Sequence, residues 1–258
     1  MKRLVLVGDG RFRTFRNLWA LEELGIQYEQ KVCFPRSTEA TNVNPFGKVP
    51  SLIDYDIDDN QKQKPFVMYE SAAINTYLGD KYRSSSTTTK GGVELVPPAG
   101  TTQRGLYEQL CYCIMTEIDA QGLWIHRKHK ALAKVFGSCP EAVDHAFDHT
   151  LNVVRTLTME HLLKSSSATI DAATTTTVTS SSYLLGESFT AADILFVHCL
   201  DWADQIGWMS KWMDENSNDK SLLLLKDVYL PLCKERPAYQ RTTKIVQENR
   251  AAAQKNKL

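Results

Sequence analysis

The sequence has no excess of either charge. Its 258 residues include 30 lysines and arginines and 30 aspartates and glutamates, so the formal net charge is zero. A protein that attracts nucleic acid or an anionic membrane by long-range electrostatics needs surplus positive charge. We therefore expect neither nucleic acid nor a membrane as a partner.

Metal-binding cysteine patterns are also missing. The six cysteines include no CxxC pair, and no group of histidines and cysteines has zinc-finger spacing. His126 and His129 are three residues apart, but no carboxylate partner is near them in the sequence. We therefore predict no metal site. We interpret the cysteines as reduced thiols packed as small apolar side chains, which suits a reducing compartment.

Long apolar runs are absent as well. Residues 4–7 form a short apolar run that Gly8 and Asp9 end, and a signal-peptide core needs roughly 7–15 residues. No stretch reaches the roughly 20 apolar residues that span a bilayer. The sequence therefore predicts a soluble cytoplasmic protein. Apolar residues still make up 43% of the chain, which is enough for a substantial core in one large or two ordinary domains.

The first 83 residues alternate between strand and helix patterns. The predicted elements are a strand at 3–7, a helix at 14–25, strands at 27–34, 49–56 and 64–70, and a helix at 70–82. A strand, a helix and a second strand imply parallel pairing through a right-handed crossover. The order β-α-β followed by β-β-α is typical of a thioredoxin-like fold.

The composition changes after these residues. Residues 84–104 are rich in Ser, Thr, Gly and Pro, which indicates a linker, and residues 105–258 have helical periodicity. Residues 165–182 are nearly all Ser, Thr and Ala, and they predict a disordered insert. Thr190 and Asp193 have capping-box spacing before a helix that is apolar on nearly all sides, so this helix is predicted to be the centre of the second domain.

Four stretches together resemble the soluble glutathione transferase family. They are RNLWALEELGIQYE at 16–29, NPFGKVPSLID at 44–54, YESAAINTYLGDKY at 69–82 and YLLGESFTAADI at 183–194. They occur in that family's order and at about its spacing, and the likeness extends over most of the chain outside the two Ser/Thr-rich segments.

The resemblance implies both a fold and an activity. The fold is an α/β thioredoxin-like N-terminal domain at 1–83 that binds glutathione, a linker at 84–104, and an all-α C-terminal domain at 105–258. The activity is conjugation of the glutathione thiolate to small hydrophobic electrophiles in detoxification. Glutathione would be a co-substrate, no cofactor would be needed, and the protein would be a homodimer.

The same resemblance assigns the glutathione-binding residues. It implies a cis Val49–Pro50 bond, so that the backbone of Val49 pairs with the cysteinyl part of glutathione; the local sequence alone leaves a trans proline before an edge strand equally open. Ser71 would bind the γ-glutamyl carboxylate at a helix N-terminus, Glu70 the α-amino group, and Lys48 the glycyl carboxylate. Plain helix capping by Glu70 and Ser71, and an ordinary exposed lysine, are the alternatives.

The family's usual thiol-activating residue is missing. Members use a Tyr or Ser hydroxyl, or a Cys, near the start of the first helix, and here the aligned position falls at Arg11 or Phe12. Thr14 is the only hydroxyl in that stretch. Three hypotheses stay open: Thr14 donates to the thiolate, Arg11 or Arg13 stabilises it with helix N–H groups, or the chain is a non-catalytic glutathione-binding or protein-interaction domain.

Two further assignments concern helices. The hydrophobic substrate would lie against the long helix that follows the linker, and core packing is the alternative for each residue there. The candidates for that site are Tyr107, Cys111, Met115 and Trp124. In the first helix, Arg16 is expected to form an ion pair with Glu22 or Glu23.

Overall fold

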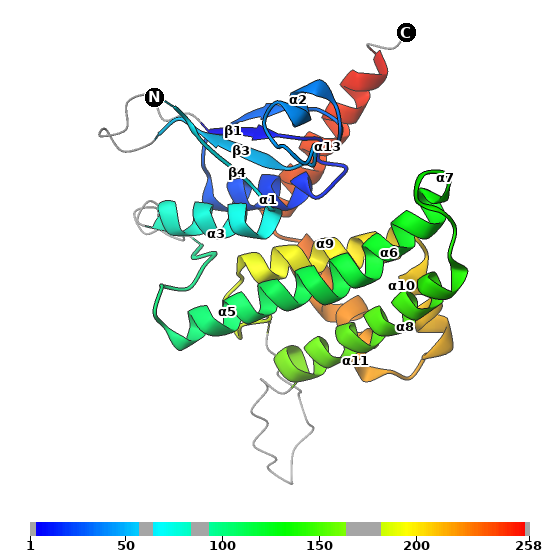
Figure 1. Cartoon of the computed structure of the whole chain (residues 1–258). Coiled ribbons are helices and arrows are strands. Elements are labelled where there is room, and N and C mark those ends of the chain that lie inside the picture. Colours follow the sequence, from blue (N-terminus) through cyan, green and yellow to red (C-terminus); the bar gives the residue numbers. More distant parts are fainter. Residues whose placement is uncertain (1–3, 57–63, 84–92, 164–181, 256–258) are drawn as a thin grey trace. The chain divides into compact units, whose positions relative to one another are not determined.

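The structure is a computed structural model that describes residues 4–56, 64–83, 93–163 and 182–255 (Figure 1). The predicted insert at 165–182, apart from its last residue, and much of the predicted linker lie outside these ranges. The chain divides into two compact units. Unit 1 comprises Met1–Val96 with Lys234–Leu258, and unit 2 comprises Pro97–Cys233.

Unit 1 contains one four-stranded sheet in the order β2-β1-β3-β4. Its elements are β1 (Leu4–Val7), α1 (Thr14–Leu24), β2 (Glu29–Lys31), α2 (Thr38–Thr41), β3 (Ser51–Asp54), β4 (Phe66–Tyr69) and α3 (Ser71–Lys81). β1 pairs in parallel with β2, and β3 is antiparallel to both β1 and β4. The thioredoxin-like order expected from the sequence is therefore confirmed.

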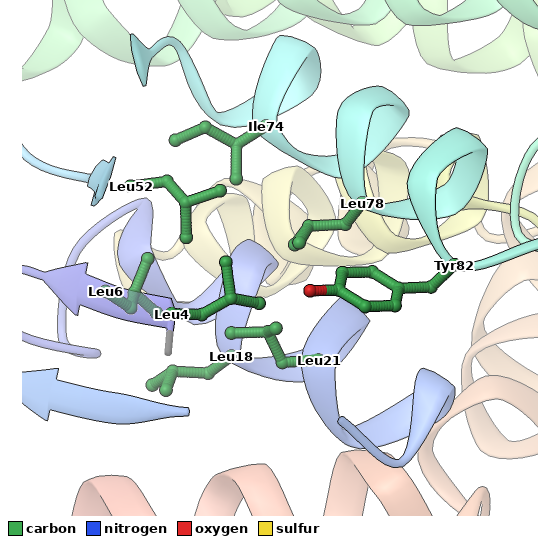
Figure 2. Packing of buried hydrophobic residues seen from close by; sticks show 8 residues of the cluster. All are labelled: Leu4, Leu6, Leu18, Leu21, Leu52, Ile74, Leu78 and Tyr82. Atoms are coloured by element: carbon green, nitrogen blue, oxygen red, sulfur yellow. The ribbon is translucent and has the colours of Figure 1, made fainter. Parts of the chain in front are cut away.

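The two faces of the sheet have separate cores because successive side chains of a strand point to opposite sides. Leu4 and Leu6 of β1 face α1 and α3 (Figure 2). The other members of that cluster are Leu18, Leu21, Leu52, Ile74, Leu78 and Tyr82. Val5 and Val7 face the opposite side, where they pack with Ala40 of α2 and with Val49.

The short helix α2 was not predicted, because its four residues lie in a loop that looks irregular between two prolines. Its sequence signal is local. Ser37 is the N-cap, and its side chain accepts a hydrogen bond from the N–H of Ala40 at 3.3 Å. A serine that caps a helix in this way satisfies one of the unpaired N–H groups of the first turn.

The last helix, α13 (Pro237–Lys255), belongs to unit 1 and packs on α1. Arg236 donates two hydrogen bonds to the buried carboxylate of Glu23, at 2.6 and 2.7 Å. The ring of Tyr239 contacts those of Phe15 and Trp19. The sequence had placed this helix in a C-terminal domain at 105–258, and here the structure differs because these long-range contacts attach it to the first unit.

Unit 2 is built from helices and helical segments with π-type hydrogen bonding. Its elements are α5 (Thr102–Cys113), η1 (Ile114–Leu123), α6 (Trp124–His126), η2 (Arg127–Ala131), α7 (Ala133–Phe136), α8 (Pro140–Leu157), η3 (Thr158–Leu163), α9 (Ala191–Gln205), α10 (Trp208–Glu215), α11 (Lys220–Leu224), η4 (Leu225–Tyr229) and α12 (Leu230–Lys234). No strand occurs among its described residues, as an all-α domain requires. No described helix has the length and apolar character needed to cross a membrane.

Helix α9 is the buried helix that the sequence predicted. Ten of its residues are buried, and its capping box is present. Thr190 donates its N–H to Asp193 at 2.8 Å, and Asp193 also accepts from the N–H of Leu184 and the hydroxyl of Tyr229, each at 2.9 Å. The carboxylate thus ties three segments of unit 2 to the start of α9.

The hydroxyl of Tyr82 predicts a stability effect. It points into the apolar cluster of Figure 2 and has no hydrogen-bond partner among the described residues. Since an unpaired buried hydroxyl is unfavourable, Tyr82→Phe should leave the free energy of unfolding unchanged or raise it by up to about 1 kcal/mol. Tyr77→Phe is the matched control: the Tyr77 hydroxyl donates to Asp54 at 2.6 Å, so its loss should lower stability by about 1.5–3 kcal/mol. Urea denaturation measures both, and a clear loss of stability in Tyr82→Phe would contradict the assignment.

Candidate functional site

Gly8, at the end of β1, is the point where three segments of unit 1 meet. Its φ is +137°, a conformation that favours glycine. A Cβ atom at Gly8 would clash with Thr14 Oγ1 and would lie 2.8 Å from the Cβ of Val49. Thr14 at the start of α1 and Val49 ahead of β3 therefore flank Gly8 closely, and a side chain here would displace one of them.

The Val49–Pro50 peptide bond is cis, as the resemblance implied. Among the described residues, no hydrogen bond outside the regular elements involves the N–H or C=O of Val49. The preceding loop is held by Asn44, whose side chain donates to the carbonyl of Lys48 and accepts from the N–H of Phe46, each at 3.0 Å. The loop thus has its own internal support, and the backbone of Val49 is available for another partner.

The N-terminus of α3 is open. Ile74 is the first residue whose N–H bonds back, to Glu70 at 2.9 Å, and among the described residues no hydrogen bond of the N–H groups of Ser71, Ala72 or Ala73 is found. No side chain caps this helix. Unpaired N–H groups and the helix dipole make such an end favourable for an anion. Glu70 precedes it with φ +78°, a strained conformation for a non-glycine residue.

Two side chains of α1 hold Ser71 in place through a buried polar network. Arg16 donates to the hydroxyl oxygen of Ser71 at 3.1 Å, and Asn17 donates to the Ser71 carbonyl at 2.9 Å and to Asn75 Oδ1 at 2.7 Å. Arg16, Asn17 and Asn75 are completely buried. A hydroxyl that accepts from a guanidinium keeps its own proton free to donate, so Ser71 can still bind an acceptor.

The expected ion pair of Arg16 with Glu22 or Glu23 stays a prediction. Glu22 pairs with Arg241 at 2.8 Å, and Glu23 pairs with Arg236. Both partners come from the C-terminal segment that packs on α1. Arg16 lies on the side of α1 that contacts α3, where it donates to Ser71.

The hydroxyl of Thr14 is buried and has no hydrogen-bond partner in the described part of the chain. Arg11 contacts other groups. Its guanidinium makes an ion pair with Asp9 at 2.6 Å and lies 4.9 Å from the centre of the Phe34 ring. This pairing raises the pKa of Arg11, and hydrogen bonds from Arg11 leave the pKa of Asp9 below its usual value although burial opposes them. The positive charge of Arg11 is thus largely compensated beside the site.

The first turn of α1 is closed only in part, because no hydrogen bond of the Thr14 N–H is found among the described residues. The N–H groups of Phe12, Phe15 and Arg16 bond to the carbonyls of Asp9, Phe12 and Arg13. These bonds use donors that would otherwise face an anion. Of the three hypotheses for the thiol, the part that rests on Arg11 is weakened by its ion pair with Asp9, and the part that rests on the half-buried Arg13 stays open. The Thr14 hydroxyl lies beside Gly8, as Val49 does.

The remaining predicted residues are placed as follows. Lys48 and Glu70 are exposed. Tyr107 and Cys111 are buried, and burial raises the pKa of Cys111 to about 12, so this thiol is inert. Met115 and Trp124 are half-buried. Among the described residues, no group of His, Cys, Asp and Glu side chains is arranged to hold a metal ion.

The sequence did not predict the buried polar residues that hydrogen-bond to the segments of the site. They are Arg16, Asn17, Asn44 and Asn75. A signal existed in the helices: Asn17 directly precedes the buried Leu18, and Asn75 directly follows the buried Ile74. A polar residue on a face that should be apolar is most often explained by a specific buried hydrogen bond.

Comparison with known proteins gives a family for the first unit. Residues 13–81 match the model described as "Glutathione S-transferase, N-terminal domain". No curated protein sequence matches the chain.

Solved structures with the same fold include three that cover nearly the whole chain. The glutathione transferase URE2P6 of Phanerochaete chrysosporium, in complex with oxidized glutathione, is 21% identical and covers 96% of this chain and 97% of its own, with a TM-score of 0.68. Ure2p in complex with glutathione is 20% identical, with 94% and 93% covered and a TM-score of 0.70. A glutathione transferase of Pseudomonas putida with bound glutathione disulfide is 19% identical, with 94% and 91% covered and a TM-score of 0.69.

The resemblance to the soluble glutathione transferase family is thereby confirmed. Residues 13–81 match the glutathione S-transferase N-terminal domain, and the chain has the glutathione transferase fold, an α/β thioredoxin-like unit with an all-helical unit.

The buried network under Ser71 predicts a large stability effect. Asn17→Ala would leave the Ser71 carbonyl and Asn75 without their donor inside the protein, so the free energy of unfolding should fall by about 2–3 kcal/mol. Asn42→Ala, at an exposed position after α2, is the control and should change stability by less than about 0.5 kcal/mol. Urea denaturation followed by circular dichroism compares the two. Equal stability of both variants would show that the network contributes nothing.

Proposed function

We propose that this protein is a glutathione transferase that conjugates the glutathione thiolate to small hydrophobic electrophiles. The observation that carries the proposal is the open N-terminus of α3 with Ser71 at its first position, in a unit that matches the model of the glutathione S-transferase N-terminal domain. Solved structures of the same fold contain glutathione or its oxidized form. The electrophile itself is specified only as hydrophobic.

Each part of the tripeptide has a complementary group. The γ-glutamyl carboxylate binds at the start of α3, where the Ser71 hydroxyl and free N–H groups donate to it and the buried charge of Arg16 lies behind. Glu70 receives the α-amino group, and Lys48 the glycyl carboxylate. The free N–H and C=O of Val49 pair with the cysteinyl residue as a short added strand. This pairing directs the sulfur towards Thr14.

The chemistry needs a thiolate. A free thiol has a pKa of about 8.5, so a donor that hydrogen-bonds the thiolate increases its share at neutral pH. We assign this role to Thr14, because its hydroxyl has no acceptor among the described residues and lies against Gly8 and Val49. The thiol proton leaves to solvent, and the sulfur then attacks the electrophilic carbon. A carbon–sulfur bond forms as the leaving group departs with its electron pair, or as a double bond takes up a proton.

The alternative is a non-catalytic glutathione-binding or protein-interaction domain of the same fold. The observation in its favour is that the Thr14 hydroxyl is covered. Contact with a ligand sulfur requires rotation of the Thr14 side chain or a shift of Val49. A transferase and a glutathione-binding domain differ in whether bound glutathione is present as thiolate.

A titration of bound glutathione separates these functions. Thr14→Val removes the donor but keeps the shape, so the bound thiol should titrate near the solution pKa of about 8.5, whereas the wild type and Thr14→Ser should keep a lower pKa. Ultraviolet absorbance of the thiolate across pH measures this. Conjugating activity at neutral pH should fall in parallel in Thr14→Val.

Ser71→Ala is the binding control in this titration. It removes a hydrogen bond to a charged group, so affinity for glutathione should drop by about tenfold or more. If the wild-type complex titrates as free glutathione does, the transferase proposal is wrong and the binding domain remains. If Thr14→Val keeps the lowered pKa, another group activates the thiol.

We also propose a homodimer in the cytoplasm, acting in detoxification. The six free cysteines suit a reducing compartment. An apolar surface suits an interface: Phe46, Phe66 and Val67 are 67%, 42% and 40% exposed. β4, which carries two of them, is an edge strand of the sheet.

Sedimentation velocity at micromolar concentration should give twice the monomer mass of 29.1 kDa. Phe46→Glu should shift the distribution towards the monomer, because it puts a charge into an apolar contact. Val135→Glu, at an exposed valine of unit 2, is the control and should leave the mass unchanged. A wild type that sediments only as a monomer rules out the dimer.

A further inference from the structure

The C-terminal helix reaches the loop that carries the thiol end of the proposed site. A Cβ atom at Gly10 would clash with Val246 of α13, so the helix lies directly against the segment between β1 and α1. One turn further along, Asn249 donates its side-chain N–H to Gln30 Oε1 at 2.9 Å. α13 thus contacts both this loop and β2.

Gln30 passes this contact on to the backbone of Gly8. Its Nε2 donates to the Gly8 carbonyl at 2.9 Å, while the Gly8 N–H donates to the carbonyl of Lys31 at 2.9 Å. The bond from Asn249 fixes which end of the Gln30 amide faces Gly8. With the amide turned round, its oxygen would face the Gly8 oxygen, and two acceptors repel one another.

The direction of the Gly8 carbonyl matters for Thr14. The Thr14 hydroxyl is close to Gly8 and has no acceptor among the described residues. A Gly8 carbonyl released from Gln30 could rotate, because glycine has wide conformational freedom. If the Gly8 carbonyl rotated towards Thr14, its oxygen would accept a hydrogen bond from the Thr14 hydroxyl. It would also place a partial negative charge beside a bound sulfur.

We infer that Gln30 and Asn249 are positioning residues for the thiol end of bound glutathione. Through them, α13 holds the Gly8 carbonyl away from Thr14 and keeps the Thr14 hydroxyl available for the thiolate. This inference rests on the proposed function. It adds the C-terminal helix to the groups that set how much of the bound thiol is ionised, although neither residue touches the substrate.

The test uses two neutral variants of nearly equal size in the full chain, Gln30→Met and Asn249→Leu. For each, the thiolate fraction of bound glutathione is measured across pH, together with the affinity for S-methylglutathione, which has no thiol to ionise. We expect the thiolate fraction at neutral pH to fall by about threefold, which is half a pKa unit. The affinity for S-methylglutathione should stay within about twofold of wild type, a change of less than half a kcal/mol.

The matched controls are Gln27→Met, just before β2, and Gln247→Leu, on α13; both positions are exposed and should leave the thiolate fraction unchanged. Equal thiolate fractions in the variants and the wild type would overturn the inference and leave the proposed function standing. An equal loss of affinity for glutathione and for S-methylglutathione would also overturn it, because that result is expected if these residues only stabilise the fold. A wild type that binds no glutathione, or binds it without lowering the thiol pKa, would overturn the proposed function and this inference together.

Discussion

The close approach of three segments at Gly8 is the constraint on which the rest of unit 1 depends. The end of β1, the first residue of α1 and the loop before β3 come so near that no side chain fits between them. Since Thr14 and Val49 are 35 residues apart in the sequence, only this contact brings a hydroxyl next to an unpaired backbone segment. The backbone of Gly8 is itself fixed on both sides, by Lys31 through its N–H and by Gln30 through its carbonyl.

The charged residues in and before α1 make the start of α3 electrostatically different from the start of α1. Arg16 is completely buried, and a buried charge is tolerated only with good hydrogen bonds, one of which goes to Ser71. Its charge adds to the open N-terminus of α3 and favours an anion there. Arg11 is paired with Asp9, and the N–H groups of Phe15 and Arg16 near the start of α1 are bonded to backbone carbonyls. The start of α3 is thus the end that favours an anion, and the start of α1 offers a neutral hydroxyl.

Sequence patterns predicted what depends on local periodicity, and family resemblance predicted the cis Val49–Pro50 bond. Strands and long helices were found because each buries one recognisable face. The capping box of α9 was found because it lies within four residues. The attachment of α13 to α1 was not found, since its ion pairs join residues more than 200 positions apart. Arg16 and Asn17 were missed for a related reason: polar residues in a helix look exposed until their partners on α3 are known.

The unpaired donors and acceptors of the proposed site differ in their access to water, and this difference decides what a ligand gains. The N–H groups at the start of α3 and the backbone of Val49 belong to loop or helix ends, where water can replace a missing partner. The Thr14 hydroxyl is dry and unpaired, and such a group costs about 1–3 kcal/mol. A ligand sulfur that reaches it therefore relieves a cost that the folded protein already carries, whereas the other contacts only exchange water for ligand. For the proposed function, this favours an ionised sulfur over a neutral thiol, because a thiolate is the stronger acceptor for the unpaired Thr14 hydroxyl.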